Sequence, residues 1–167
     1  ATVQATAIPL PTAAAAGTDQ TICEENTTLS GNNPNVGTGA WTLVSGTGVI
    51  ANPALANTAV SGIAIGTSRF AWTITNGGQC VSSDTVEVTR IPPPDAANAG
   101  PDIQVCGTTT SLAGSTPVIG SGLWTVVSGS GIFDNNEHPS SDVFGLAVGA
   151  NVFQWTVSNG VCPPSTD

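Results

Sequence analysis

The sequence repeats itself with a period of 83 residues, and this repeat constrains the fold more than any other feature. An offset of 83 positions aligns WTLVSGTGVI (41–50) with WTVVSGSGIF (124–133), and FAWTITNG (70–77) with FQWTVSNG (153–160). The same offset superimposes Cys23 on Cys106. A duplicated sequence of this length predicts two small modules, each with its own core, and not one large domain.

Each unit has the pattern of a small all-β domain. Glycine (20 residues) and proline (12 residues) punctuate short runs rich in Thr, Val and Ile, which favour strands. We predict strands over 18–23, 26–30, 39–45, 47–51, 58–65, 68–76 and 84–91. Short strands at this spacing are typical of Ig-like sandwiches. The predicted fold is therefore all-β, with two tandem Ig-like β-sandwich modules of about 83 residues joined by a Pro-rich linker.

The repeat frame places the module boundaries at proline-rich segments. IPPPDAANA (91–99) and its earlier copy IPLPTAAAA (8–16) favour polyproline II, which makes a semi-rigid spacer. The segment 2–9 aligns with 85–92, at the end of the first unit. We therefore predict that residues 1–11 are the last strand and linker of a preceding module. Residues 12–94 would be the first Ig-like repeat with its linker, and residues 95–167 the second repeat lacking its last strand.

The aromatic residues of the predicted strands lie on one face. Phe70, Trp72 and Ile74 alternate with Arg69, Ala71, Thr73 and Thr75, which is the pattern of a strand with one buried and one wet face. A sugar-stacking platform is the alternative role for the tryptophans. We expect the core to contain Trp41, Trp72, Trp124, Trp155, Phe70 and Phe153.

Each unit contains two cysteines, and we predict one disulfide in each unit. The repeat assigns Cys23 to Cys80 and Cys106 to Cys162. Each bridge would close a loop of about 57 residues and contribute about 4 kcal/mol under the chain-entropy argument. Disulfides persist in oxidising compartments, so we expect an extracellular or cell-surface protein.

The charge of the chain excludes several kinds of partner. Only 8% of the residues are charged, and the formal net charge is −9. A phosphate backbone or an anionic lipid surface would be repelled, so we expect no nucleic acid partner. No apolar run approaches the roughly 20 residues that span a bilayer, so we expect no direct membrane insertion.

No reactive cluster recurs in both units. His138 is the only histidine, and its counterpart is Leu55, so the segment DNNEH (134–138) is interpreted as a solvated loop. The adjacent Glu24 and Glu25 also lack acidic counterparts. A group confined to one copy does not serve the repeat, so we predict that the protein is not an enzyme and has no cofactor.

Asp19 and Asp102 recur beside the linkers and are the candidate metal ligands. A Ca²⁺ site needs six or more oxygen ligands, and the sequence offers one such side chain per unit. A turn-capping role is the preferred interpretation, and Ca²⁺ binding is the alternative. Asn26, in the sequence Asn-Thr-Thr, is a candidate for N-glycosylation.

The strings AGPDIQVCGTTTSLAG (99–114), WTVVSGSG (124–131) and FQWTVSNGVCPPSTD (153–167) resemble the tandem Ig-like and PKD-like repeats of large Bacteroidota surface adhesins, of the gliding-motility type. The resemblance covers most of both units. It implies cell-surface export, repetitive arrays, and adhesion or motility along surfaces, without a catalytic motif. The segment 84–86 is similar to the acceptor that these bacteria O-glycosylate, which makes Thr85 a candidate site.

We therefore predict a non-catalytic structural or adhesive repeat of an extracellular surface fibre or adhesin. Its partners would be neighbouring copies of the repeat, surface glycans or other proteins. One alternative is a filament subunit, in which residues 2–8 complete the second module of a neighbour by strand donation. The other alternative is a carbohydrate-binding module of a secreted protein.

Overall fold

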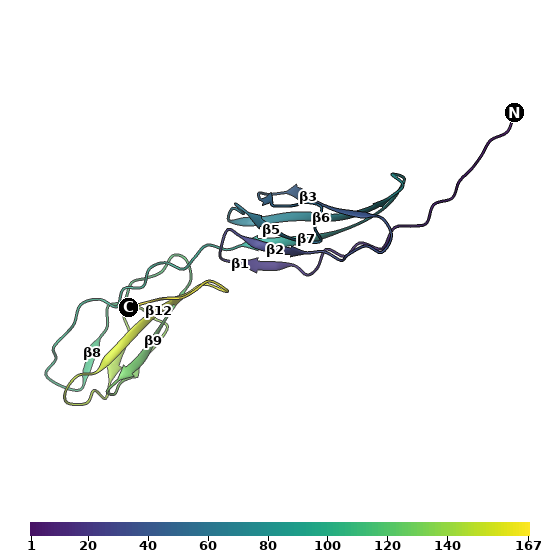
Figure 1. Cartoon of the computed structure of the whole chain (residues 1–167). Coiled ribbons are helices and arrows are strands. Elements are labelled where there is room, and N and C mark those ends of the chain that lie inside the picture. Colours follow the sequence, from purple (N-terminus) through teal and green to yellow (C-terminus); the bar gives the residue numbers. More distant parts are fainter. The chain divides into compact units, whose positions relative to one another are not determined.

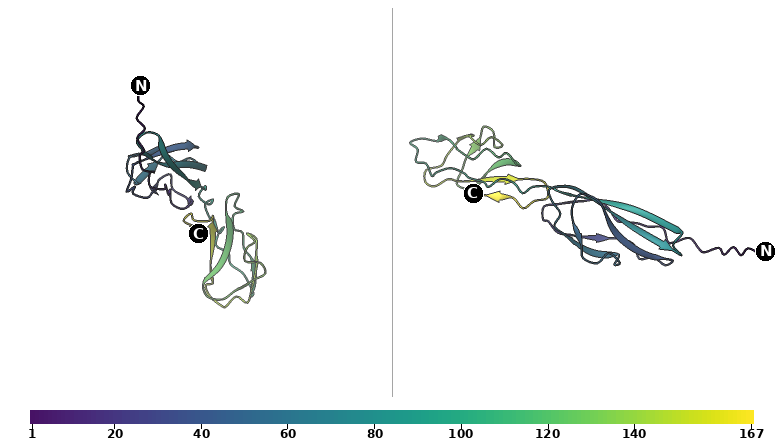
Figure 2. Two further views of the ribbon diagram at one scale, coloured as in Figure 1. Left: turned by 90° about the vertical axis from the view of Figure 1, so that its right-hand side faces the viewer. Right: turned by 90° about the horizontal axis from the view of Figure 1, so that it is seen from above.

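The structure is a computed structural model that describes all residues from 1 to 167, and its only regular elements are strands. The chain divides into two compact units, unit 1 (Ala1–Ile91) and unit 2 (Pro92–Asp167), shown in Figures 1 and 2. The predicted all-β, Ig-like fold class is confirmed. No helix is present that could cross a membrane.

Unit 1 is a sandwich of two sheets. One sheet has the strand order β1-β7-β6-β3, and the other has the order β2-β5-β4. The pairing of β1 with β7 is parallel, and all the other pairings are antiparallel. The strands are β1 (Gln20–Ile22), β2 (Thr27–Ser30), β3 (Thr38–Ser45), β4 (Val49–Ile50), β5 (Asn57–Ser61), β6 (Gly66–Asn76) and β7 (Cys80–Arg90).

Unit 2 repeats this arrangement with fewer residues in strands. Its sheets have the orders β13-β12-β9 and β10-β11-β8. Trp124 faces Trp155 across β9 and β12, as Trp41 faces Trp72 across β3 and β6. The strands are β8 (Thr109–Ser111), β9 (Ser121–Ser128), β10 (Ile132–Phe133), β11 (Asp142–Phe144), β12 (Val152–Ser158) and β13 (Ser165–Thr166).

Strand β1 has no counterpart in unit 2. In unit 1 it pairs with Val88–Arg90, whereas residues 103–105, at the positions that correspond to β1, form no strand. The strand expected over residues 2–8 is also not formed, and Val3 is almost fully exposed.

Each core is built around a pair of tryptophans. The ring centroids of Trp41 and Trp72 are 5.1 Å apart, and those of Trp124 and Trp155 are 5.0 Å apart. All four side chains are at most 2% exposed. Their indole N–H groups donate to backbone carbonyls, which satisfies the one polar atom that each ring buries.

The two cores differ at the phenylalanine of the β6 and β12 strands. Phe70 is fully buried opposite Val86, whereas Phe153 is half-buried. Phe153 packs edge-on against Phe133, with ring centroids 5.6 Å apart.

Candidate functional site at the module poles

A proline-rich segment precedes each sandwich, and three side chains of the sandwich bind its backbone. In unit 1 these side chains are Asn76, at the end of β6, and Ser82 and Asp84, on β7. Their contacts are Asn76 Nδ2 to the Pro9 carbonyl oxygen (2.8 Å), the Ala14 N–H to Ser82 Oγ (2.9 Å) and the Ala16 N–H to Asp84 Oδ2 (2.8 Å). We call these three residues the linker clasp.

Unit 2 has the same linker clasp, formed by Asn159, Ser165 and Asp167. The contacts are Asn159 Nδ2 to the Pro92 carbonyl oxygen (2.8 Å), the Ala97 N–H to Ser165 Oγ (2.9 Å) and the Ala99 N–H to Asp167 Oδ2 (2.8 Å). Sequence reasoning missed the clasp. The sequence does contain a sign of it, because each of these three polar residues is the same in both units, 83 positions apart.

One further contact of the linker differs between the units. Thr12 Oγ1 accepts hydrogen bonds from two backbone N–H groups in unit 1 (2.9 and 3.0 Å). In unit 2 the corresponding residue is Asp95, whose Oδ2 accepts from the N–H groups of Ile119 (3.0 Å) and Val118 (2.6 Å). These two bonds hold the pKa of the Asp95 carboxyl below its ordinary value of 3.8. The residue that holds the linker at this point is therefore an uncharged threonine in unit 1 and a charged aspartate in unit 2.

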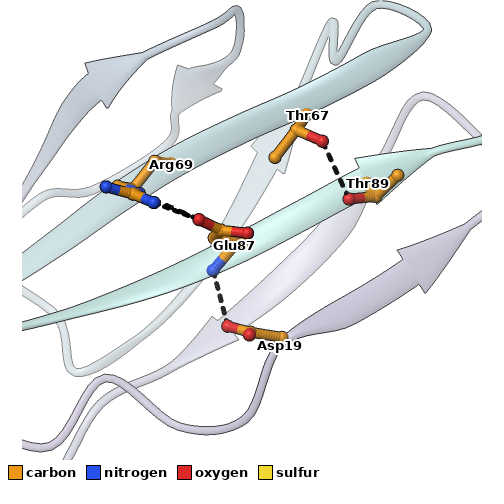
Figure 3. Close-up of polar contacts among 5 residues, drawn as sticks. All are labelled: Asp19, Thr67, Arg69, Glu87 and Thr89. Atoms are coloured by element: carbon orange, nitrogen blue, oxygen red, sulfur yellow. Dashed lines mark hydrogen bonds and ion pairs between the residues drawn. The ribbon is translucent and has the colours of Figure 1, made fainter.

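Asp19 lies beside β7, where its Oδ1 accepts a hydrogen bond from the Glu87 backbone N–H (2.8 Å; Figure 3). The Glu87 side chain forms an exposed ion pair with Arg69 on β6, which raises the pKa of the guanidinium. The contact of Asp19 fixes the start of β1 against β7. Asp102 is exposed, in a segment without a strand, and the chain has no group of three or more His, Cys, Asp or Glu side chains that could hold a metal ion.

The cysteines of unit 1 lie at opposite ends of the sandwich. Cys80 begins β7, at the end that also holds Asn76 and Pro9, which we call the N-terminal pole. Cys23 follows β1, whose last residue is paired with Arg90 at the end of β7. The Arg90 Nε donates to the Cys23 carbonyl oxygen (3.0 Å), at what we call the C-terminal pole.

This placement corrects the predicted disulfides Cys23–Cys80 and Cys106–Cys162. Cys80 and Arg90 are the first and last of the 11 residues of β7. At about 3.3 Å per residue the two ends of the strand are about 33 Å apart. Cys23 lies beside Arg90 and is therefore far from Cys80. A disulfide requires Cα atoms within about 7 Å of each other. In the structure Cys80 and Cys106 are free thiols, and Cys23 and Cys162 are disulfide-bonded, so neither predicted pair is formed.

The cysteines of unit 2 are placed in the same way. Cys162 is 5% exposed, and its Sγ lies 3.4 Å from the carbonyl oxygen of Pro92, at the N-terminal pole of this unit. Cys106 is exposed at the other end, in a loop where the Leu146 N–H donates to the Thr108 carbonyl oxygen (3.0 Å). The equivalent bond beside Cys23, from Ile63 to Glu25, has the same length.

The remaining candidate residues lie apart from one another on exposed loops and strands. His138 is exposed in a turn in which Asn135 Oδ1 accepts from the Glu137 N–H, and Asn52 forms the same turn in unit 1. Glu24 and Glu25 are exposed between β1 and β2. The candidate glycosylation sites Asn26 and Thr85 are both exposed.

No tryptophan presents its ring to solvent. A pocket of about 280 Å³ lies beside Trp72 and is lined by small residues such as Gly37, Gly39 and Ala56. The Trp72 ring is 1% exposed, so it offers no free face on which a sugar could stack.

Comparisons with known proteins show the fold alone. No family model matches the chain, and no curated protein matches it. The eight N-terminal Ig domains of Down Syndrome Cell Adhesion Molecule align with 95% of this chain and 27% of their own, at 13% identity and a TM-score of 0.51. Dpr11 IG1 bound to DIP-gamma aligns over 95% and 96% of the two chains, at 15% identity and a TM-score of 0.44. The fibronectin(III)-like modules of Clostridium thermocellum CbhA align over 91% and 87%, at 11% identity and a TM-score of 0.43.

Proposed function

We propose that this chain is a non-catalytic repeat of an extracellular surface fibre or adhesin, and that its modules transmit tension along that fibre. The observation that carries the proposal is the parallel pairing of β1 with β7 in unit 1. These strands are the first and the last of the module, so they lie next to the two points at which the chain enters and leaves it.

The parallel pairing determines how tension acts on the module. A pull on the segment before β1 and an opposite pull on Ile91 would slide β1 and β7 along each other. The hydrogen bonds between the two strands would then be loaded together, whereas in an antiparallel terminal pair they would be loaded one after another. Asp19 and Arg90 add side-chain contacts at the two ends of this pair.

The linker clasp supports the same function. Pro9, Ala14 and Ala16 are bonded to the sandwich that follows them, and the corresponding residues of unit 2 are bonded in the same way. A linker held along its length has little freedom to change direction within its own module. An array of such modules would therefore keep a bound tip or surface at a fixed distance from the cell.

Localisation and adhesion are inferred from the chemistry and from the fold. A disulfide favours an oxidising, extracellular compartment. The Ig domains with the TM-score of 0.51 come from a protein named as a cell adhesion molecule. Adhesion within a fibre of the gliding-motility type, with surface glycans or other repeats as partners, is the finer form of this proposal.

Single-molecule force spectroscopy tests the tension-bearing role. The chain is pulled from its two ends in a reducing buffer, so that no disulfide carries the load in place of the strands. We expect unit 1 to unfold in one step at a force that depends on the β1–β7 bonds. The Ile91 N–H donates to the Ile22 carbonyl oxygen (2.9 Å), so Ile22 faces β7 with its backbone polar groups.

Three variants make the measurement specific. Ile22→Pro removes a donor directed at β7 and should lower the unfolding force, whereas Thr21→Pro removes a donor on the free edge and should leave it nearly unchanged. Ile22→Ala keeps the N–H and controls for the lost side chain. An unfolding force that Ile22→Pro lowers no more than Ile22→Ala does would reject the shear mechanism. A hydrolytic activity retained by a single unit would reject the non-catalytic function.

A further inference from the structure

The chain contains two Asn-Gly pairs, and both lie in the linker clasp. They are Asn76-Gly77 in unit 1 and Asn159-Gly160 in unit 2, and every other asparagine of the chain is followed by a residue other than glycine. Each of the two asparagines donates its side-chain N–H to a proline carbonyl oxygen of the linker in its own unit. The Asn-Gly pair is therefore confined to one place in the fold, where it touches the linker.

An asparagine that is followed by glycine can lose its amide without an enzyme. Asparagine is one of the thermolabile residues of proteins, and glycine has no Cβ that would obstruct the approach of its backbone nitrogen. That nitrogen attacks the side-chain carbonyl carbon of the asparagine, passes its proton to the amide nitrogen and expels it as ammonia. Water then opens the resulting succinimide ring and leaves aspartate or isoaspartate. The net reaction consumes one water and releases one ammonia, with no oxidant or reductant.

The docked linker of unit 1 contacts both residues that would react. Asn76 Nδ2, which is the leaving nitrogen of this reaction, donates to the Pro9 carbonyl oxygen (2.8 Å). The Ile8 side chain lies over Gly77, because a Cβ added at this glycine would clash with Ile8 Cδ1. Asn76 is also held in β6, where it pairs with Cys80. The side chain of Asn76 must leave Pro9 before the glycine nitrogen can displace its amide, so we expect the reaction to be slow while the linker is docked.

The products of the reaction cannot restore the bond to the linker. In aspartate an oxygen takes the place of Asn76 Nδ2, and an ionised carboxylate only accepts hydrogen bonds. It would face the Pro9 carbonyl oxygen, which is also an acceptor, and the two oxygens would repel each other. Asn159 and Pro92 have the same relationship in unit 2. Each event would therefore remove one of the three contacts of the linker clasp.

We propose that Asn76 and Asn159 are sites of spontaneous deamidation, that the docked linker protects each of them, and that the reaction makes a release of the linker irreversible. The co-reactant is water alone. A module whose linker has stayed docked keeps its asparagine, and a module whose linker has been released converts it to an acidic residue. The reaction occurs whether or not the module bears tension, so it can be tested apart from the force measurement.

Peptide mapping by mass spectrometry tests the protection. The full chain is incubated in a mildly alkaline buffer, with and without urea, and the rates of deamidation at Asn76 and Asn159 are measured separately. We expect both sites to react at least about tenfold more slowly in the folded protein than in urea, because the hydrogen bonds of the linker clasp must first break. Equal rates with and without urea would overturn the proposal.

Two variants distinguish protection by the linker from protection by the sandwich. Ile8→Ala uncovers the glycine, and Ser82→Ala removes the acceptor of one linker N–H. Each should raise the rate at Asn76 severalfold and leave the rate at Asn159 unchanged, so that unit 2 is the internal reference. Val3→Ala is the matched control, because this side chain is 97% exposed. No increase with either variant would show that the linker does not protect the site.

Hydrogen exchange of the linker tests the consequence of the reaction. Asn76→Asp copies one product, and it should speed the exchange of the Ala14 and Ala16 amide protons severalfold, since their bonds to the sandwich open together with the linker. The Ala97 and Ala99 amide protons of unit 2 should exchange as in the wild type. Unchanged exchange at Ala14 and Ala16 would show that deamidation leaves the linker docked, which would contradict the proposal.

Discussion

The Asp84 carboxylate accepts a hydrogen bond from the backbone N–H of Ala16, at 2.8 Å, and so attaches the linker to the four-stranded sheet of the first module. Ala16 is buried, and its N–H would otherwise face the interior of the sandwich without an acceptor. The second module repeats the contact between Asp167 and Ala99 at the same distance. This bond explains why an acidic residue recurs at these two positions.

Replacing Asp84 by alanine should destabilise unit 1 by about 1–2 kcal/mol, because the Ala16 N–H is left buried without a partner. Asp84→Asn keeps an acceptor oxygen and should have a smaller effect. Urea unfolding monitored by tryptophan fluorescence gives both values. The neighbouring exposed Thr85→Val is the control, and a loss of stability in the control equal to that of Asp84→Ala would contradict the role of the carboxylate.

Replacing Gly39 by alanine should destabilise unit 1 by about 1–3 kcal/mol. A Cβ at this position would lie 2.1 Å from the Trp72 ring, which is buried and cannot move aside. Gly122 has the same relationship with Trp155, at 1.9 Å. The adjacent Ala40→Val, on the exposed face, should be tolerated. Thermal unfolding followed by near-ultraviolet circular dichroism distinguishes the two variants, and equal melting temperatures would argue against close packing at this glycine.

Unit 2 should lose stability in acid through Asp95. Its folded-state pKa lies below the ordinary value of 3.8, so the contribution of the carboxylate is present above that pH and is lost as the pH falls through the folded pKa. The amide proton shifts of Val118 and Ile119 should titrate together in NMR spectra. Asp95→Thr, which copies Thr12 of unit 1, should keep both bonds and abolish the titration. Persistence of the titration in this variant would assign it to another group.

Replacing Arg90 by methionine should destabilise unit 1 by about 1 kcal/mol or more. Its guanidinium donates to the carbonyl oxygens of Cys23 (3.0 Å) and Ile63 (2.8 Å), and its side chain is mostly buried. Arg69→Met is the matched control, because Arg69 forms only an exposed ion pair with Glu87 and should have less effect. The free energies of unfolding of the two variants are measured in guanidinium chloride. A larger loss of stability for Arg69→Met than for Arg90→Met would contradict this prediction.

The repeat made most of the architecture predictable. The expected strand over 39–45 corresponds to β3 (Thr38–Ser45), and its copy is β9 (Ser121–Ser128), shifted by the full repeat length. The alternation of apolar and polar residues predicted that Trp72 and Trp155 are buried, because strand side chains point alternately to the two faces of a sheet. The strand positions and this alternation are patterns of neighbouring residues, so they can be recognised in one sequence without knowledge of distant contacts.

The disulfides were not predictable in the same way. The repeat shows that Cys23 and Cys80 occur in one unit, but it does not show at which pole each lies. That information comes from the parallel pairing of β1 with the far end of β7, a contact between residues distant in sequence. The linker clasp was missed for a similar reason, since Asn76 and Ser82 recur in the sequence but their partners are backbone atoms.

The linker clasp also determines where a separately expressed module must begin. Pro9, Ala14 and Ala16 precede β1, yet their backbone groups are bonded to the sandwich. A fragment that begins at Gln20 would lose all three bonds and would leave the Asp84 carboxylate without the Ala16 N–H. The shortest stable form of unit 1 therefore begins before its first strand, in the proline-rich segment.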